Sequence, residues 1–79
     1  MPAPKTEIEW QERTRAYLKG KLMDSNITYV GLVARIRKLG FDETEASITN
    51  KLARGTFSAT FFLAALTAIG CDTIKIKEI

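Results

Sequence analysis

The sequence predicts an all-α fold of four to five short helices, followed by a short C-terminal β-strand or extended tail. Three observations lead to this prediction. Four segments with helically spaced apolar residues each follow a Ser, Thr or Asp that can cap a helix N-terminus. Gly40, Gly55 and Gly70 stand where three of these segments should end. The 79 residues, 46% of them hydrophobic, fit a single globular domain.

The chain is expected to divide into three parts: a disordered N-terminal arm over residues 1–6, a helical domain over 7–70, and a C-terminal strand or tail over 71–79. The arm should be disordered because Pro2 and Pro4 lack a backbone donor and the segment has little to bury. In the tail, residues 73–77 alternate apolar and polar side chains, which is the period of a strand.

The first helix should begin near Thr6 and fade around residues 24–26. Thr6 and Glu9 have the spacing of a capping box, in which each side chain reaches the other residue's backbone N–H. Large side chains are needed to bury enough area in so small a domain, so six aromatic residues are expected in the core: Trp10, Tyr17, Phe41, Phe57, Phe61 and Phe62. The alternative use of such residues is stacking on single-stranded bases.

The second helix should open with Thr28 as its N-cap and close at Gly40. At about 100° per residue, four apolar side chains cluster into one buried stripe, namely Leu32, Val33, Ile36 and Leu39. Arg35 and Lys38 lie on the opposite side and should face water.

The third helix is predicted between a capping box formed by Asp42 and Glu45 and a stop at Arg54-Gly55. Its inward face is expected to carry Ile48, Leu52, Thr49, Ala53 and Ala46. Its other face is polar and should carry Asn50, Glu43, Arg54, Ser47 and Lys51.

The fourth helix should be capped by Ser58 and end at Gly70. It is apolar nearly all round, and its apolar residues include Phe61, Phe62, Leu63, Ala65, Leu66 and Ile69. Such a helix is either the central element of the domain or has one side in a subunit interface.

Several chemistries are excluded by the residues that the chain lacks. It has no histidine and one cysteine, Cys71. A disulfide framework, a Cys/His zinc site and a Ser-His or Cys-His nucleophile pair are therefore absent, and we expect neither an enzyme nor a cofactor or metal. A lone cysteine suggests a reducing compartment, so we expect a cytoplasmic protein. The longest apolar stretch, residues 61–69, is far shorter than the ~20 residues of a membrane span.

Positive charge is concentrated in the middle of the chain. Residues 13–54 carry nine Lys and Arg against four Asp and Glu, a surplus of five, whereas the whole chain has a net charge of +3. A basic centre on a small domain favours a polyanionic partner, although scattered surface lysines and arginines produce the same count.

Four short helices with tight connections, a basic centre and a polar third helix are typical of a helix-turn-helix module. The segment Ile-Thr-Tyr-Val-Gly-Leu-Val at residues 27–33, followed by Leu39-Gly40, resembles the second helix of lambda repressor-like (Xre/Cro type) DNA-binding domains. The segment Lys-Leu-Ala-Arg-Gly at residues 51–55 is similar to the end of that family's recognition helix and its closing glycine. The next helix of this family has a counterpart in a segment that resembles it and carries Leu63, Leu66, Ala68, Ile69 and Gly70.

Residues 9–74 also resemble a small family of uncharacterised bacterial domains that share the stretch Arg-Gly-x-Phe-Ser-Ala-x-Phe, here residues 54–61. The two resemblances imply a helix-turn-helix domain over residues 7–70, and the broader one implies binding to DNA. In this sequence Tyr29 replaces the glutamine customary in the broader family, and the turn before the third helix is about two residues longer.

The candidate DNA contacts come from the polar face of the third helix and from its neighbours: Ser47, Asn50, Lys51, Arg54, Arg35, Lys38, Tyr29 and Ser58. Asn50 can pair with adenine, and Arg54 or Lys51 with guanine. Arg35 and Lys38 either grip phosphate or remain solvated. Tyr29 either packs inward or donates to a phosphate, and Ser58 either holds phosphate through its backbone amide or only caps a helix.

The expected function is sequence-specific binding of double-stranded DNA for transcriptional regulation, with the helix at residues 44–54 in the major groove. A homodimer is expected, because two copies double the contacts of one short reading helix. The alternative is a protein–protein interaction module that has the fold without the DNA-binding role. Asp42, Glu43 and Glu45 favour this alternative, since phosphate would repel them unless they lie above the groove or read a cytosine amino group. Their other possible role is to stabilise the helix N-terminus.

Overall fold

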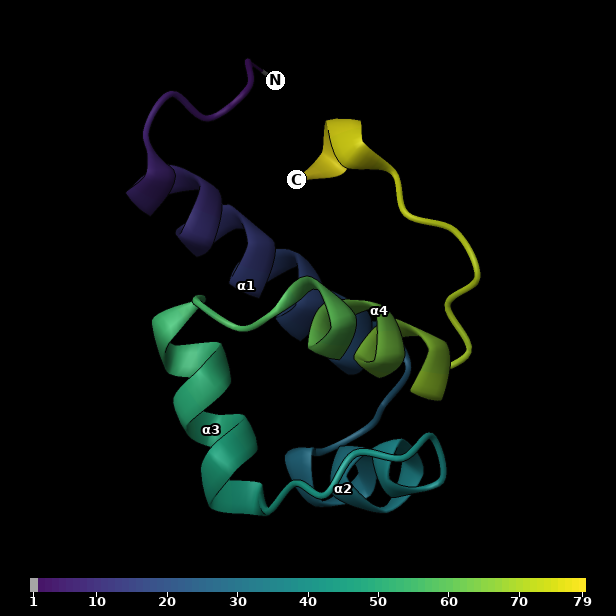
Figure 1. Cartoon of the computed structure of the whole chain (residues 1–79). Coiled ribbons are helices and arrows are strands. Elements are labelled where there is room, and N and C mark those ends of the chain that lie inside the picture. The colour runs from purple at the N-terminus through teal and green to yellow at the C-terminus, as the bar shows by residue number, and fades with distance from the viewer. Residues whose placement is uncertain (1) are drawn as a thin grey trace.

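The computed structural model describes residues 2–79 and contains four α-helices joined by short loops (Figure 1). They are α1 (Glu7–Asp24), α2 (Tyr29–Arg37), α3 (Glu45–Arg54) and α4 (Ala59–Ala68), and a short 3-10 helix, η1 (Ile76–Glu78), follows them. The predicted all-α fold is confirmed. The strand expected over residues 73–77 does not form, because this segment meets no partner strand anywhere in residues 2–79.

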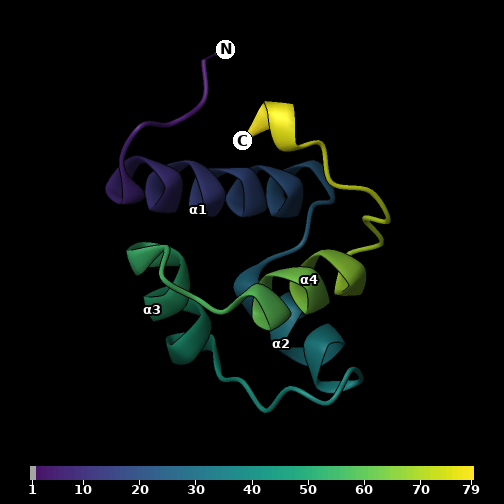
Figure 2. The same ribbon diagram turned by 45° about the horizontal axis from the view of Figure 1, so that its top comes forward.

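The four helices share one apolar core. α3 contacts both α1 and α2, and α4 also contacts both of them, so α3 and α4 lie between the other two helices (Figure 2). Three of the helices each contribute two fully or nearly buried side chains four residues apart, a spacing that places both on one helix face: Leu18 and Leu22, Leu32 and Ile36, Ile48 and Leu52. Phe61, Ala65 and Leu66 of α4 complete the centre.

Five of the six aromatic residues expected in the core lie in or against it. Phe57 and Phe41 pack against the Phe61 ring at centroid distances of 5.4 Å and 6.5 Å. Phe62 and Tyr17 also lie in or against the core. The expectation for Trp10 was wrong, because it remains 42% exposed near the start of α1, where it borders a hollow formed with the two chain ends.

Two further apolar residues are more exposed than their helical pattern suggests. Leu39 follows the end of α2, so it no longer shares the orientation of the buried stripe formed by Leu32 and Ile36. Leu63 of α4 is 52% exposed, whereas Phe61 and Leu66 on the same helix are buried. The fourth helix is therefore central on one side and uncovered on the other.

Each α-helix begins with a hydroxyl cap. Thr6, Thr28, Thr44 and Ser58 accept a hydrogen bond from the backbone N–H three residues later, at 3.0–3.1 Å. The capping box predicted at Thr6 forms only in half, since the Glu9 carboxylate accepts from the N–H of Lys5.

The cap of the third helix lies two residues later than predicted. The helix begins after Thr44, and the Ser47 hydroxyl accepts a hydrogen bond from the Thr44 N–H at 2.8 Å, which completes a capping box. The prediction that Asp42 and Glu45 form this box was therefore wrong. Thr44 and Ser47 satisfy both backbone donors reciprocally, and this leaves no capping role for Asp42.

The two chain ends meet on α1. After Gly70 the tail returns along α1, so that both ends lie on the same side of the molecule (Figures 1 and 2). The Arg13 guanidinium donates to the carbonyl oxygens of Pro2 and Ile79, and the N–H of Lys75 donates to the Tyr17 hydroxyl. Pro4 is buried. Within the described residues the N-terminal arm thus packs against the domain, which differs from the disorder expected for it.

Candidate nucleic-acid interface

The outward face of α3 is wider than the sequence pattern indicates. Ile48 and Leu52 are buried, as expected, but Ala46, Thr49 and Ala53 are exposed, which corrects their assignment to the inward face. Two large side chains spaced by one turn are enough to fill the contact of α3 with its neighbours, and the smaller residues beside them remain in solvent. The exposed face also carries Asn50 and Arg54.

A shallow groove brings five of the predicted DNA-binding residues together. Its volume is about 480 Å³, and it lies where α3 meets the start of α4. The predicted residues that line it are Ser47, Asn50, Lys51, Arg54 and Ser58, and Thr56 and Phe57 complete the lining. The other three predicted residues, Arg35, Lys38 and Tyr29, do not line this groove.

Glu43, just before α3, binds two of the groove residues. The residue is only 7% exposed. One of its carboxylate oxygens accepts a hydrogen bond of 2.6 Å from the Ser47 hydroxyl, and the other forms an ion pair with the Lys51 ammonium group. The Lys51 nitrogen also lies 4.7 Å from the centroid of the Phe61 ring, in cation–π contact. We call Glu43, Ser47 and Lys51 the Glu43 cluster.

The Glu43 cluster keeps its carboxylate ionised. Burial alone raises the pKa of Glu43, but the hydrogen bonds from Lys51 and Ser47 and the positive charge of Lys51 outweigh this, so that the pKa lies below its ordinary value of 4.5. The negative charge of Glu43 balances the charge of Lys51 locally. Lys51 therefore contributes less to a phosphate- or guanine-binding surface than its position suggests.

Asn50 and Arg54 are the predicted DNA-binding residues of the groove whose polar groups stay available. Both are exposed, and within residues 2–79 neither side chain makes a hydrogen bond or an ion pair. The amide of Asn50 offers donors and an acceptor, and the Arg54 guanidinium offers up to five donors. These two residues are the ones best able to bind an external polar ligand.

Of the remaining predicted DNA-binding residues, two have a structural role and two are exposed to solvent. Ser58 caps α4 by accepting from the Phe61 N–H at 3.1 Å, which accounts for its position without a ligand. Tyr29 is half-buried and packs against the core. Arg35 and Lys38 are exposed on α2 and at its end.

Sequence reasoning missed the function of Glu43 in the fold. The sequence placed Glu43 on the polar face of the third helix and grouped it with the acidic residues near the helix N-terminus. It gave no indication that Glu43 is buried. The signal was nonetheless present, since Glu43, Ser47 and Lys51 follow one another at intervals of four residues, which is the spacing of side chains that meet along a helix.

Two further features bear on the kinds of site that these residues can form. Within residues 2–79, no group of three or more Cys, Asp or Glu side chains is placed to hold a metal ion. None of the helices formed by these residues has the length and apolar character needed to cross a membrane.

The structure thus defines a small four-helix domain with a polar groove beside its third helix. Residues 10–74 match the model of the family described as "Domain of unknown function (DUF6471)", and because this match spans most of the chain, the chain belongs to that family. Comparisons with curated proteins and with solved structures gave no match.

Proposed function

We propose that the chain is a sequence-specific double-stranded DNA-binding protein of the lambda repressor-like helix-turn-helix type, which regulates transcription in the cytoplasm with α3 in the major groove. The observation that carries this proposal is the exposed face of α3, on which Asn50 and Arg54 have no partner within residues 2–79. An α-helix fits the width of the major groove, and a helix so placed needs free polar side chains on its outward side.

The chemistry of the two residues suits base edges. The Asn50 amide can donate to N7 and accept from N6 of adenine, and the Arg54 guanidinium can donate to both acceptors of guanine. Arg35 and Lys38 supply exposed positive charge on the preceding helix, which suits contacts to the phosphate backbone. Such contacts fix the register of a helix in the groove but carry no sequence information themselves.

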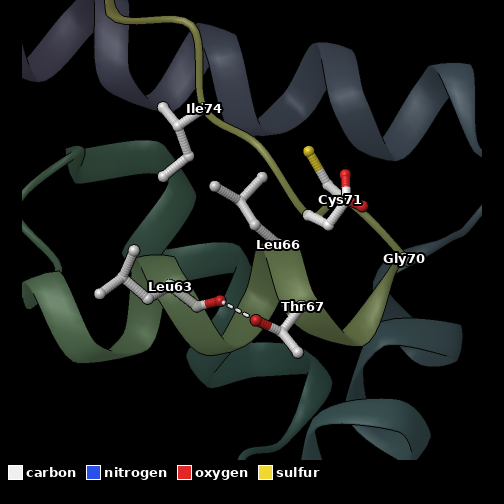
Figure 3. A pocket seen from close by; sticks show the side chains of 7 residues that line it. Leu63, Leu66, Thr67, Gly70, Cys71 and Ile74 are labelled. Carbon is white, nitrogen blue, oxygen red and sulfur yellow. Dashed lines mark hydrogen bonds between the residues drawn. The ribbon is translucent and has the colours of Figure 1, made fainter.

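A homodimer forms part of this proposal. One copy of α3 reads only a few base pairs, and a two-fold dimer places two reading helices about one DNA turn apart. The uncovered side of α4 offers an apolar surface for the contact. There Leu63 and Thr67 line a hollow of about 410 Å³ together with Gly70, Cys71 and Ile74 (Figure 3).

Selection of bound sequences from a random duplex pool at low salt tests the proposal. Retained duplexes should share a common sequence arranged as two half-sites. Replacing Arg54 with Ala should weaken binding to the selected duplex about tenfold or more, because one bidentate contact is worth about 1–3 kcal/mol. Lys77→Ala is the matched control, since Lys77 is exposed on η1 and should leave affinity nearly unchanged. Equal affinity of wild type and Arg54→Ala would remove α3 as the reading helix.

The dimer is tested separately by sedimentation. Leu63→Asp places a charge on the uncovered side of α4 and should convert a dimer to a monomer without unfolding the chain, because Leu63 lies outside the buried core. Val30→Asp is a control, since Val30 is similarly exposed on α2. A dimer that persists in Leu63→Asp would exclude this surface.

A specific observation also favours the alternative, a protein-interaction module. Trp10 and Ile76 are exposed large apolar residues, and they border one hollow with Ala3 and Pro4 at the joined chain ends. Exposed aromatic anchors of this kind are enriched at protein interfaces. If no duplex is retained at low salt while Trp10→Ala abolishes binding of an identified protein partner, this alternative is the correct function.

A further inference from the structure

The centre of the outward face of α3 is occupied by small side chains. Asn50 is exposed there, and its exposed neighbours one turn before and three residues after it are Ala46 and Ala53. Thr49 precedes Asn50, and a shallow hollow of about 340 Å³ is lined by Glu45, Ala46, Thr49 and Asn50. Short side chains allow the helix to approach the floor of a groove closely.

Thr49 presents mainly its methyl group to a partner. Its hydroxyl donates a 2.8 Å hydrogen bond to the carbonyl oxygen of Glu45 in the same helix. A hydroxyl has a single proton to donate, so Thr49 retains only acceptor lone pairs and its methyl group for a ligand. Together with the methyl groups of Ala46 and Ala53, this makes the surface around Asn50 apolar.

The one charge bordering this hollow is negative. Glu45 is exposed at the first position of α3, and within residues 2–79 its carboxylate forms no ion pair. Guanine presents two acceptors, N7 and O6, to the major groove. A carboxylate repels these acceptors but can accept from the N4 amino group of the paired cytosine, so Glu45 alone does not exclude a G·C pair. No free donor other than the Asn50 amide lines the hollow to bind guanine. Thymine, in contrast, presents a methyl group.

From this arrangement we infer that the face around Asn50 selects A·T base pairs, with Asn50 on an adenine edge and the methyl groups of Ala46, Thr49 and Ala53 against thymine methyl groups. This inference rests on the proposed function and specifies the sequence that α3 reads. Arg54 lies one turn beyond Asn50 and would contact a neighbouring base pair, where its guanidinium can donate to a guanine.

Base analogues in the selected duplex test the inference directly. Uracil in place of thymine removes only the methyl group. At the positions read by α3, this replacement should weaken binding about fourfold for each methyl group buried. Replacing adenine with 7-deazaadenine removes the N7 acceptor and should weaken binding at the position of Asn50 by about tenfold.

A matched pair of variants assigns the effect to Thr49. Thr49→Ser removes the methyl group and keeps the hydroxyl bond to Glu45, so this variant should discriminate less between thymine and uracil than the wild type. Thr73→Ser is the control, because Thr73 is exposed in the tail and lines neither the groove and hollow beside α3 nor the hollow on α4. It should discriminate as the wild type does.

The outcomes separate this inference from the proposed function. A chain that binds a selected duplex but tolerates uracil at every position, or that selects half-sites without A·T pairs, overturns the inference and leaves DNA binding intact. A chain that retains no duplex at low salt overturns both. If uracil lowers affinity, and Thr49→Ser reduces this loss while Thr73→Ser does not, both the inference and the proposed function are supported.

Discussion

Gly55, which ends α3, lies directly against the backbone of α1. It has a φ of +69° and ends α3 in the left-handed conformation. A Cβ atom at this position would lie 2.6 Å from the carbonyl oxygen of Gln11 and 3.1 Å from its carbonyl carbon. Backbone atoms in the middle of a helix cannot move aside as a flexible side chain can. Gly55 is therefore required for its conformation and for its lack of a side chain.

We predict that Gly55→Ala lowers the free energy of unfolding by about 3 kcal/mol, which combines left-handed strain with overpacking against α1. Gly70→Ala is the matched control. Gly70 has a φ of +82°, but nothing lies within 4 Å of its Cβ position, so the cost should be about 1 kcal/mol. Urea denaturation measures both, and equal losses would show that the contact with Gln11 is unimportant.

The buried carboxylate of Glu43 makes stability depend on pH. Its pKa is lowered in the folded chain, so its stabilising contribution is complete above the ordinary pKa of 4.5 and is lost as pH falls through the folded pKa. We predict that acidification below about pH 4.5 lowers the urea midpoint of the wild type, and that Glu43→Gln flattens this dependence.

Glu45→Gln is the control for this measurement, because Glu45 is an exposed carboxylate two residues away that forms no ion pair within residues 2–79. It should keep the pH dependence of the wild type. Glu43→Gln should also cost about 1–3 kcal/mol near neutral pH, since Lys51 and Ser47 lose a charged partner. If the urea midpoint of Glu43→Gln falls at acidic pH as much as that of the wild type, this account is contradicted.

At the scale of an element, α3 depends on its N-terminal cap. The helix has only ten residues, and isolated helices of this length are marginal in water. Thr44 and Ser47 satisfy each other's backbone N–H groups, and Arg15 of α1 donates to the carbonyl oxygen of Ala53 near the other end. Hydrogen bonds at both ends thus hold the proposed reading helix in place.

We predict that Thr44→Ala destabilises the domain by about 1 kcal/mol, the typical loss of a hydroxyl cap. Asp42→Asn should change stability by less than about 0.5 kcal/mol, because Asp42 is exposed and does not cap the helix. Thermal unfolding followed by circular dichroism compares the two variants. A larger loss of stability in Asp42→Asn than in Thr44→Ala would indicate that Asp42 caps the helix, as the sequence predicted.

At the scale of the whole molecule, the tail closes the side of α1 that α3 and α4 leave open. Ile79 is 9% exposed and belongs to the core, although it is the last residue of the sequence. The Arg13 guanidinium donates to the carbonyl oxygens of both Ile79 and Pro2, so one side chain of α1 binds both chain ends. The tail thus extends the core of a domain whose small size limits burial.

We predict that Ile79→Ala lowers the free energy of unfolding by about 2 kcal/mol, the low end of the range for a buried isoleucine. Ile76→Ala removes the same atoms from a side chain that is 65% exposed, and it should cost less than about 0.5 kcal/mol. Chemical denaturation of the pair gives the comparison. Equal, small losses would show that the tail packs too loosely to stabilise the domain.

Local signals in the sequence were enough to predict the four helices. Hydroxyl caps at Thr6, Thr28 and Ser58 act within three residues of their own backbone, and residues such as Leu32 and Ile36 share a face because of helix geometry alone. The same periodicity placed Asn50 and Arg54 on the exposed face of α3. These features depend on neighbours along the chain, which a sequence displays directly.

Contacts between distant residues decided the rest. The 2.6 Å approach at Gly55 involves Gln11, the exposure of Trp10 depends on the course of residues 74–79, and the position of Lys51 over Phe61 depends on how α4 meets α3. The sequence alone determined which segments are helical and which large apolar side chains share a helix face. Only the tertiary structure decided which polar groups of α3 remain free, because burial and pairing arise when helices far apart in the chain pack together.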